Sequence, residues 1–291
     1  MLNTIRAVTI CAPDLKAIET AYETWLQYKT IARGTVSAPL AALWRTPRMM
    51  GREMLLMQPS SGEPVFLRFV AAEKEPEFAP MRTTGWNAME ILVRDPEKIA
   101  RDLAGSPFTI LGPTRGNSSH ENISAIHVLG PARELLYLTR IPENEPAFNL
   151  GSARTEVDRV FIVVVGGRDL PAIRNFYADR LKMTVTDPID VRISVLSNAY
   201  GLAPEHLHRL AIARFPERFL IEIDEYPASA ADRPVRPGEL PPGMAAVSFG
   251  ARSLDGFAEQ SIELTEPPYD GRRAALIIGT AGEMIELIEK A

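Results

Sequence analysis

The stretch RVFIVVVGGRD, residues 159–169, decides the fold. Its apolar, largely β-branched run predicts a buried strand, and the run ends at Asp169, where a side chain can cap a helix. The residues that follow repeat at helical spacing along one stripe: Leu170, Ile173, Phe176, Tyr177 and Leu181. A later stretch, FLIEID (219–224), predicts the last strand of the unit. This segment therefore predicts a β-α-β-β-β unit.

The same order recurs three more times along the chain. The other copies open with AVTICAPD (7–14), AMEILVRD (88–95) and AVSFGARS (246–253), and they close with PVFLRFV (64–70), ELLYLTRI (134–141) and MIELI (284–288). Each copy spans roughly 65–85 residues, and four copies fill the chain. One such unit has a single sheet and cannot bury its apolar face alone, whereas two units can close a curved sheet around a shared cavity.

The repeats predict an α+β fold of four βαβββ modules paired into two curved-sheet (open barrel) domains. Residues 142–156 are rich in Pro, Asn, Gly and Ser and predict a linker. We therefore expect an N-terminal pair of modules in residues 1–145 and a C-terminal pair in residues 155–291. The sequence leaves open whether modules pair within one chain or by exchange across a homodimer.

Composition limits the function. The 291 residues carry a formal net charge of −5, with 46% hydrophobic and 24% charged residues, which is typical of a globular protein and argues against a nucleic-acid binder. The longest apolar run, residues 160–165, is too short to cross a membrane. The single cysteine, Cys11, favours a reducing compartment, so we expect a cytoplasmic protein whose partner is a small molecule.

The openings and closings of the modules resemble those of a known family. Residues 158–162 lead to Asp169 and then to LIEIDEYP (220–227), and the fourth unit ends with IELIE (285–289). With the four-fold order, they make nearly the whole chain similar to the vicinal oxygen chelate superfamily, which includes glyoxalase I, extradiol dioxygenases, fosfomycin-resistance proteins and bleomycin-binding proteins.

The resemblance implies a divalent metal in each active cup, held by the first strand (usually His) and last strand (usually Glu) of both modules. The matching positions hold Ala7, Ala88, Arg159 and Ala246 in the first strands, and Leu67, Tyr137, Glu222 and Glu286 in the last. The expected histidines are missing, which argues against a glyoxalase I and against an extradiol dioxygenase, which needs two His and one carboxylate. We expect a degenerate N-terminal cup and a candidate active C-terminal cup.

Two glutamates are the strongest catalytic candidates. Glu222 and Glu286 each interrupt an apolar strand, and strand alternation would point both into one cup. Two carboxylates sharing a cavity raise one pKa, which suits a general acid or base. Arg159 could bind a substrate carboxylate or enolate beside them. The structural alternatives are solvated glutamates on an exposed face and a salt bridge for Arg159.

Three further residues are candidates for substrate binding. His206 and His208 would share one strand face, which also allows a metal pair, although a polar loop explains them too. Tyr137 could offer its phenol to a substrate, or it could be an ordinary strand tyrosine.

The sequence supports three functional hypotheses. The favoured one is a lyase or isomerase that needs no cofactor and transfers a proton on a small oxygenated or aromatic metabolite, with Glu222 or Glu286 moving the proton and Arg159 stabilising the anion. The second is a non-catalytic binder similar to the bleomycin-resistance branch. The third keeps a divalent metal ion on Glu222, Glu286 and His208.

Overall fold

The computed structural model describes residues 2–112, 115–117, 120–143, 149–216, 218–257 and 260–290, with backbone alone for 115–117 and 120–122. The first two modules contain the following elements: β1 (Leu2–Ala12), α1 (Leu15–Trp25), β2 (Tyr28–Thr35), α2 (Ala38–Trp44), the 3-10 turn Pro47–Met49, β3 (Glu53–Pro59) and β4 (Phe66–Ala71), then β5 (Gly85–Val93), α3 (Pro96–Asp102), β6 (Thr109–Ile110), β7 (Arg115–Asn117), β8 (His120–Leu129) and β9 (Leu135–Arg140).

The last two modules differ from each other: module 3 keeps the order of module 1, with α5 in the place of α2, whereas the described residues of module 4 form strands without a helix. Their elements are β10 (Val157–Gly167), α4 (Leu170–Asn175), the π-helical turn Phe176–Arg180, β11 (Thr184–Val185), β12 (Ile189–Val191), α5 (Ser194–Tyr200), β13 (His208–Arg214) and β14 (Leu220–Glu225), then β15 (Met244–Ala251), β16 (Ile262–Leu264), β17 (Arg272–Ile278) and β18 (Met284–Glu289). The predicted α+β fold of four modules in two curved sheets is confirmed.

Aspartates start the module helices, as the sequence predicted. Asp14 accepts a hydrogen bond from the Ala17 amide at 2.9 Å, and Asp169 accepts one from the Ala172 amide at 2.9 Å. Asp95 does the same for the amide of Lys98 at 3.0 Å. Each carboxylate satisfies one backbone N–H that has no partner within its helix.

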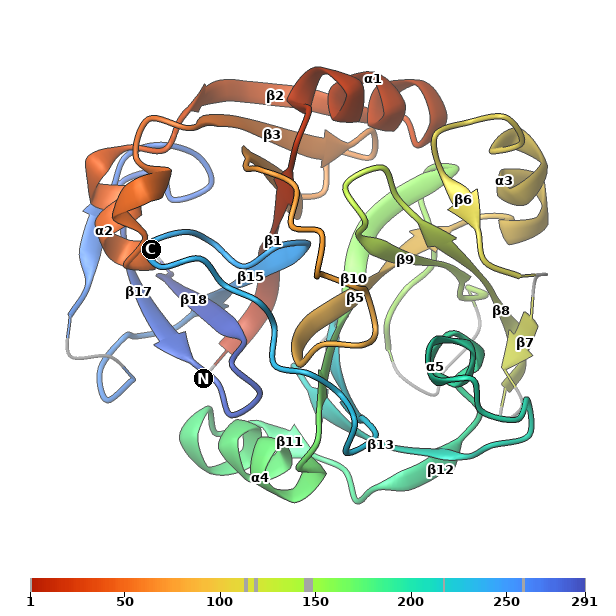
Figure 1. Cartoon of the computed structure of the whole chain (residues 1–291). Helices are drawn as coiled ribbons and strands as arrows, with labels where there is room; N and C mark the ends of the chain where they lie inside the picture. Colours follow the sequence, from red (N-terminus) through yellow and green to blue (C-terminus); the bar gives the residue numbers. More distant parts are fainter. Residues whose placement is uncertain are drawn as a thin grey trace.

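The two sheets combine the modules in an order that the sequence did not predict. The first sheet has the strand order β16-β17-β18-β15-β1-β4-β3-β2, and the second has the order β11-β13-β14-β10-β5-β9-β8-β6 (Figure 1). The first sheet therefore joins modules 1 and 4, and the second joins modules 2 and 3. The expected pairing within residues 1–145 and within 155–291 is wrong, because β1 pairs antiparallel with β15 and β5 pairs antiparallel with β10.

The main core lies between the sheets and the module helices. Tyr22 of α1 and Tyr177 of the π-helical turn are fully buried in it, and α1 and α4 lie at opposite ends of the molecule (Figure 1). The other face of each sheet forms a cup, which we call the first cup for the first sheet and the second cup for the second. Among the described helices, none is long and apolar enough to cross a membrane.

Candidate active site in the second cup

The first cup is closed by an internal ion pair. Strand register places Thr9 of β1 beside Arg68 of β4, and Ser248 of β15 beside Glu286 of β18. All four side chains are completely buried. The Arg68 guanidinium donates to the Thr9 hydroxyl at 2.9 Å and lies 3.2 Å from a Glu286 carboxylate oxygen. Burial disfavours the charge on Arg68, but Glu286 and Tyr269 together more than offset this and raise the pKa of the guanidinium.

Both carboxylate oxygens of Glu286 are engaged by neighbouring side chains. Its carboxylate accepts hydrogen bonds from the Trp44 indole N–H and the Tyr269 hydroxyl, each at 2.8 Å, and from Ser248. Trp44 belongs to α2, whose apolar side chains fill the first cup together with Leu276 and Ile288. The expectation that Glu286 is a catalytic residue in a shared cavity with Glu222 is therefore wrong, because the two glutamates belong to different sheets.

The second cup is open. It encloses a cavity of about 460 Å³, which lies within the usual range for small-molecule sites. The lining comes from β5, β8, β9, β13 and β14 and from the segment that leads into α5: Glu90, Ile123, Ala125, His127, Tyr137, Thr139, Val191, Arg192, Ile193, Ser194, Pro204, Leu210 and Glu222. Two carboxyl groups contributed by different modules, Glu90 and Glu222, therefore face one cavity.

Strand register explains why these side chains meet. Glu90 of β5 lies beside Tyr137 of β9, and Val164 of β10 lies beside Glu222 of β14. These positions correspond to those of Thr9, Arg68, Ser248 and Glu286 in the first cup. The same four places thus hold a sealed ion pair in one sheet and two open carboxyl groups in the other.

The carboxyl groups of the second cup hold their protons tightly. Burial, and then the neighbouring Glu222, raise the pKa of Glu90 to about 8, although a hydrogen bond from Thr139 at 2.9 Å opposes the shift. Burial and the adjacent Asp224 raise the pKa of Glu222 well above its usual range. Asp224 is fully buried, and burial raises its pKa to about 7. The described residues supply no hydrogen-bond donor to Asp224, so we infer that Glu222 and Asp224 share a proton.

Tyr137 completes the floor of the cup. Its ring packs against His127 with the ring centroids 4.4 Å apart. Its hydroxyl is buried, and no described residue forms a hydrogen bond with it. Burial, Asp224 and Glu222 raise the pKa of the phenol well above its usual value, so the hydroxyl keeps its proton and can donate. The sequence suggested a place for Tyr137 in the cup of the N-terminal pair, whereas the structure places it in the second cup, in register with Glu90.

Arg159 lies elsewhere and has another role. Its guanidinium donates to the Leu150 carbonyl at 2.6 Å and lies over the Phe219 ring, 5.4 Å from its centroid. Burial lowers its pKa to about 10. The expectation that Arg159 stabilises an anion in the cup is wrong, because its side chain holds the segment before β10 in place.

The two histidines do not line the cavity. His208 is buried, and its Nε2 lies 2.8 Å from the Ser197 hydroxyl of α5. His206 is exposed, with its ring centroid 4.7 Å from that of His208. Burial, followed by the neighbouring His206, lowers the pKa of His208. The contact between His208 and Ser197 fixes α5 to β13. Substrate binding by the two histidines stays a prediction.

Glu90 is the candidate site residue that sequence reasoning missed. The sequence matched the first-strand position of module 2 to Ala88, two residues earlier on the same face of β5. A signal was present, because Glu90 interrupts the apolar run AMEILV (88–93) in the way that Glu222 interrupts its own strand. An acidic residue inside a buried strand is the pattern that would have found it.

The donor sets do not fit the metal that the resemblance implies. In the first cup a guanidinium occupies one of the four strand positions, and guanidinium groups do not coordinate cations. Within the described part of the chain, no three His, Cys, Asp or Glu side chains converge as metal ligands would. The alternative set of Glu222, Glu286 and His208 is not assembled, because Glu286 lies in the other sheet.

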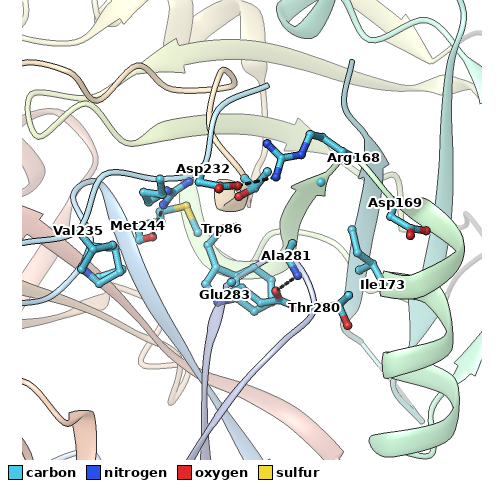
Figure 2. A pocket seen from close by; sticks show the side chains of 17 residues that line it. Trp86, Arg168, Asp169, Ile173, Asp232, Val235, Met244, Thr280, Ala281 and Glu283 are labelled. Atoms are coloured by element: carbon cyan, nitrogen blue, oxygen red, sulfur yellow. Dashed lines mark hydrogen bonds and ion pairs between the residues drawn. The ribbon is translucent and has the colours of Figure 1, made fainter. Parts of the chain in front are cut away.

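A separate cavity of about 340 Å³ lies where the two sheets meet (Figure 2). Its charged side chains are mostly paired with their surroundings. Arg168 donates to Asp232 at 2.6 Å, and Glu283 accepts from the Ala281 amide at 2.8 Å. The second cup, with two carboxyl groups that have no cationic partner in the described structure, is therefore the stronger candidate for chemistry.

Comparison with solved structures agrees with the fold. The chain is similar to glyoxalase I from Zea mays, with 12% identity, a TM-score of 0.64, and coverage of 98% of this chain and 92% of that one. It is also similar to a putative dioxygenase from Bacillus subtilis, with 9% identity, a TM-score of 0.59, and coverage of 99% and 85%. No family model matches the sequence, and no curated protein matches it.

These likenesses define the class of fold. The chain has the vicinal oxygen chelate fold, in the two-domain, four-module arrangement also seen in glyoxalase I. At this level of identity the likeness concerns the fold, so the chemistry has to be argued from the second cup itself.

Proposed function

We propose that the second cup is the active site of a lyase or isomerase that transfers a proton on a small oxygenated or aromatic metabolite. The observation that carries this proposal is the meeting of Glu90 and Glu222, from different modules, in one cavity of about 460 Å³. Two buried carboxyl groups that interact cannot both ionise easily, so near the Glu90 pKa of about 8 one can act as an acid while the other acts as a base.

The geometry supplies the parts of a proton transfer. An ionised carboxylate takes the proton from a carbon next to a carbonyl, so a C–H bond breaks and a carboxyl O–H forms, while the electron pair moves to the carbonyl oxygen. The Tyr137 hydroxyl donates a hydrogen bond to that oxygen. In an isomerase the proton then returns to another carbon. In a lyase the second carboxyl group protonates a leaving group on the neighbouring carbon.

Hydrogen–deuterium exchange tests this proposal before the substrate is identified. The full-length protein is incubated in D2O with a series of α-hydroxy ketones, α-keto acids and β-hydroxy acids, and loss of the C–H signal is followed by NMR. We expect exchange above buffer with at least one compound class. The variants Glu90→Gln and Glu222→Gln should slow this exchange by about 10²-fold or more, which is the usual contribution of a general acid or base.

Glu225→Gln is the matched control. Glu225 lies on the same strand as Glu222 but on the opposite face, 3.6 Å from the partly exposed Arg209. This variant should exchange at the wild-type rate. The proposal fails if no compound exchanges above buffer, or if Glu90→Gln and Glu222→Gln both keep the full rate.

A non-catalytic binding function is the second candidate. It is favoured by the apolar side of the second cup, formed by Ile123, Ile193 and Leu210, and by carboxyl groups that stay protonated near neutral pH. Ligand binding without any exchange in D2O would support it. Metal analysis of protein purified without chelators tests the remaining alternative. Stoichiometric divalent metal that disappears in both glutamate variants would replace the acid–base role with a metal site.

A further inference from the structure

The floor of the second cup gathers three acidic groups, and none of them forms a salt bridge within the described residues. Burial raises the pKa of each group, and a neighbouring acid adds to the shift: Glu222 for Glu90, Asp224 for Glu222, and Glu90 for Asp224. A cation bound beside these groups would favour their ionised forms. Arg209, on the neighbouring strand β13, is engaged elsewhere, since it pairs with Glu225.

An unsatisfied polar group points to a ligand at the same place. Tyr137 lines the cavity and is 5% exposed, and its hydroxyl has no described hydrogen-bond partner. A buried polar group without a partner is costly, so native proteins rarely leave one without a functional reason.

The chemistry of the floor selects among ligand classes. A carboxylate or phosphate at the floor would make the three acidic groups still harder to ionise, so an anionic group has to lie elsewhere in the cup. A divalent metal ion needs several converging ligands, and the described part of the chain holds no set of three. A protonated amine needs only hydrogen-bond acceptors and a negative partner, and its N–H groups can be shared between carboxylates and the tyrosine oxygen.

The walls favour an organic body on this amine. Ile123, Ile193 and Leu210 offer apolar contact, and the stacked rings of His127 and Tyr137 offer an aromatic surface. The one arginine in the lining, Arg192, is exposed. We infer that the second cup binds a molecule with a protonated amine on a small apolar or aromatic body, the amine lying between Glu90, Glu222 and the Tyr137 hydroxyl. This inference rests on the proposed function of the second cup and names its ligand class.

Three probes of similar size test the inference: benzylamine, benzyl alcohol and benzoate. Their affinities for the full-length protein are measured at pH 7 by calorimetry. We expect benzylamine to bind at least about tenfold more tightly than benzyl alcohol, and benzoate to bind most weakly. Glu222→Gln should remove this preference. Glu225→Gln should keep the preference, and circular dichroism checks that both variants are folded.

Several results would overturn the inference. One is that benzyl alcohol binds as tightly as benzylamine. Another is that benzylamine shows no binding at concentrations up to about the millimolar range, at about 10-fold excess over the protein. Displacement of benzylamine by MnCl2 at stoichiometric concentration would assign the floor to a metal ion. Deuterium exchange that depends on Glu222 without any preference for amines would remove this inference and leave the proposed function standing. A preference for amines without exchange would keep the inferred ligand class and remove the proposed catalytic function.

Discussion

At the scale of single residues, the neighbours of a glutamate decide what it does. Glu286 and Glu222 occupy corresponding positions in the last strands of modules 4 and 3. Glu286 meets Arg68 at 3.2 Å and becomes part of a closed network. Glu222 meets the carboxyl groups of Glu90 and Asp224 and keeps a raised pKa. The same residue type is therefore structural in one cup and a candidate for chemistry in the other.

The buried ion pair of the first cup gives a prediction about stability. We expect Arg68→Met to lower the free energy of unfolding by about 3–5 kcal/mol, because it leaves the Glu286 carboxylate buried without its cation. The double variant Arg68→Met with Glu286→Gln should lose less than the sum of the two single changes, since the pair is directly coupled. Urea unfolding measures all three.

A surface pair on the same sheet provides the control. Arg273 lies 2.8 Å from Glu289 and is exposed, so Arg273→Gln should cost less than about 1 kcal/mol. A loss of similarly small size for Arg68→Met would contradict the prediction and would mean that the first cup admits water or a proton to Glu286.

At the scale of elements, two equivalent turns hold the sheets together. The turn before β9, residues 130–134, ends in Glu134, which accepts a hydrogen bond from the Tyr22 hydroxyl at 2.6 Å. The turn before β18, residues 279–283, ends in Glu283, which accepts one from the Tyr177 hydroxyl at 3.1 Å. Each contact joins one sheet to a helix or turn of a module in the other sheet. Burial raises the pKa of both glutamates to about 7.

The glycines that open these turns have no room for a side chain. A Cβ atom on Gly130 would lie 1.9 Å from a carboxylate oxygen of Glu134, and one on Gly279 would lie 1.9 Å from that of Glu283. We expect Gly130→Ala and Gly279→Ala each to lower the free energy of unfolding by about 2 kcal/mol or more, because the glutamate must leave its tyrosine. Thermal unfolding of the variants measures the effect.

Gly34→Ala is the comparison. No atom lies within 4 Å of a Cβ built on Gly34, in strand β2. This change should therefore stay within about 0.5 kcal/mol of the wild type. Equal effects at all three glycines would show that the turns tolerate displacement of their glutamates.

At the scale of the whole molecule, the first and last modules share one sheet and the two middle modules share the other. Each half of the chain therefore holds half of each sheet (Figure 1). We expect fragments 1–145 and 155–291 to remain unfolded or aggregated alone and to form a folded complex when expressed together. Size-exclusion chromatography with circular dichroism tests this. Two halves that each unfold cooperatively as monomers would contradict it.

Buried acids set the pH dependence of stability for the whole chain. The pKa values of Glu134, Glu283 and Asp224 rise to about 7 and that of Glu90 to about 8. Between the ordinary carboxyl range near pH 4.5 and these values, the folded chain binds more protons than the unfolded chain, so stability falls as pH rises. We expect a higher Tm at pH 5 than at pH 8, with the difference reduced in Glu134→Gln. A Tm that is constant or higher at pH 8 would contradict this.

Sequence periodicity determined the local structure and part of the site. The apolar runs, the capping aspartates and the repeated order predicted four βαβββ modules, because the face on which a strand residue lies depends only on its position in that strand. For this reason Glu222 could be assigned to the wall of a cup from strand alternation, whereas Tyr137 was assigned through the resemblance to the family. The sequence matched the last-strand position of module 1 to Leu67, whereas the residue that faces the first cup is its neighbour Arg68. A shift of one residue moves a side chain to the opposite face of the sheet.

Tertiary structure alone decided which modules share a sheet and which cup stays open. The pairing of β1 with β15 joins residues more than two hundred positions apart, and no local pattern encodes such a contact. That pairing separates Glu286 from Glu222, brings Arg68 to Glu286, and leaves Glu90 as the partner of Glu222 in the second cup. The chemistry proposed for this chain depends on contacts between modules, whereas short-range patterns of apolar and polar residues predict the modules themselves.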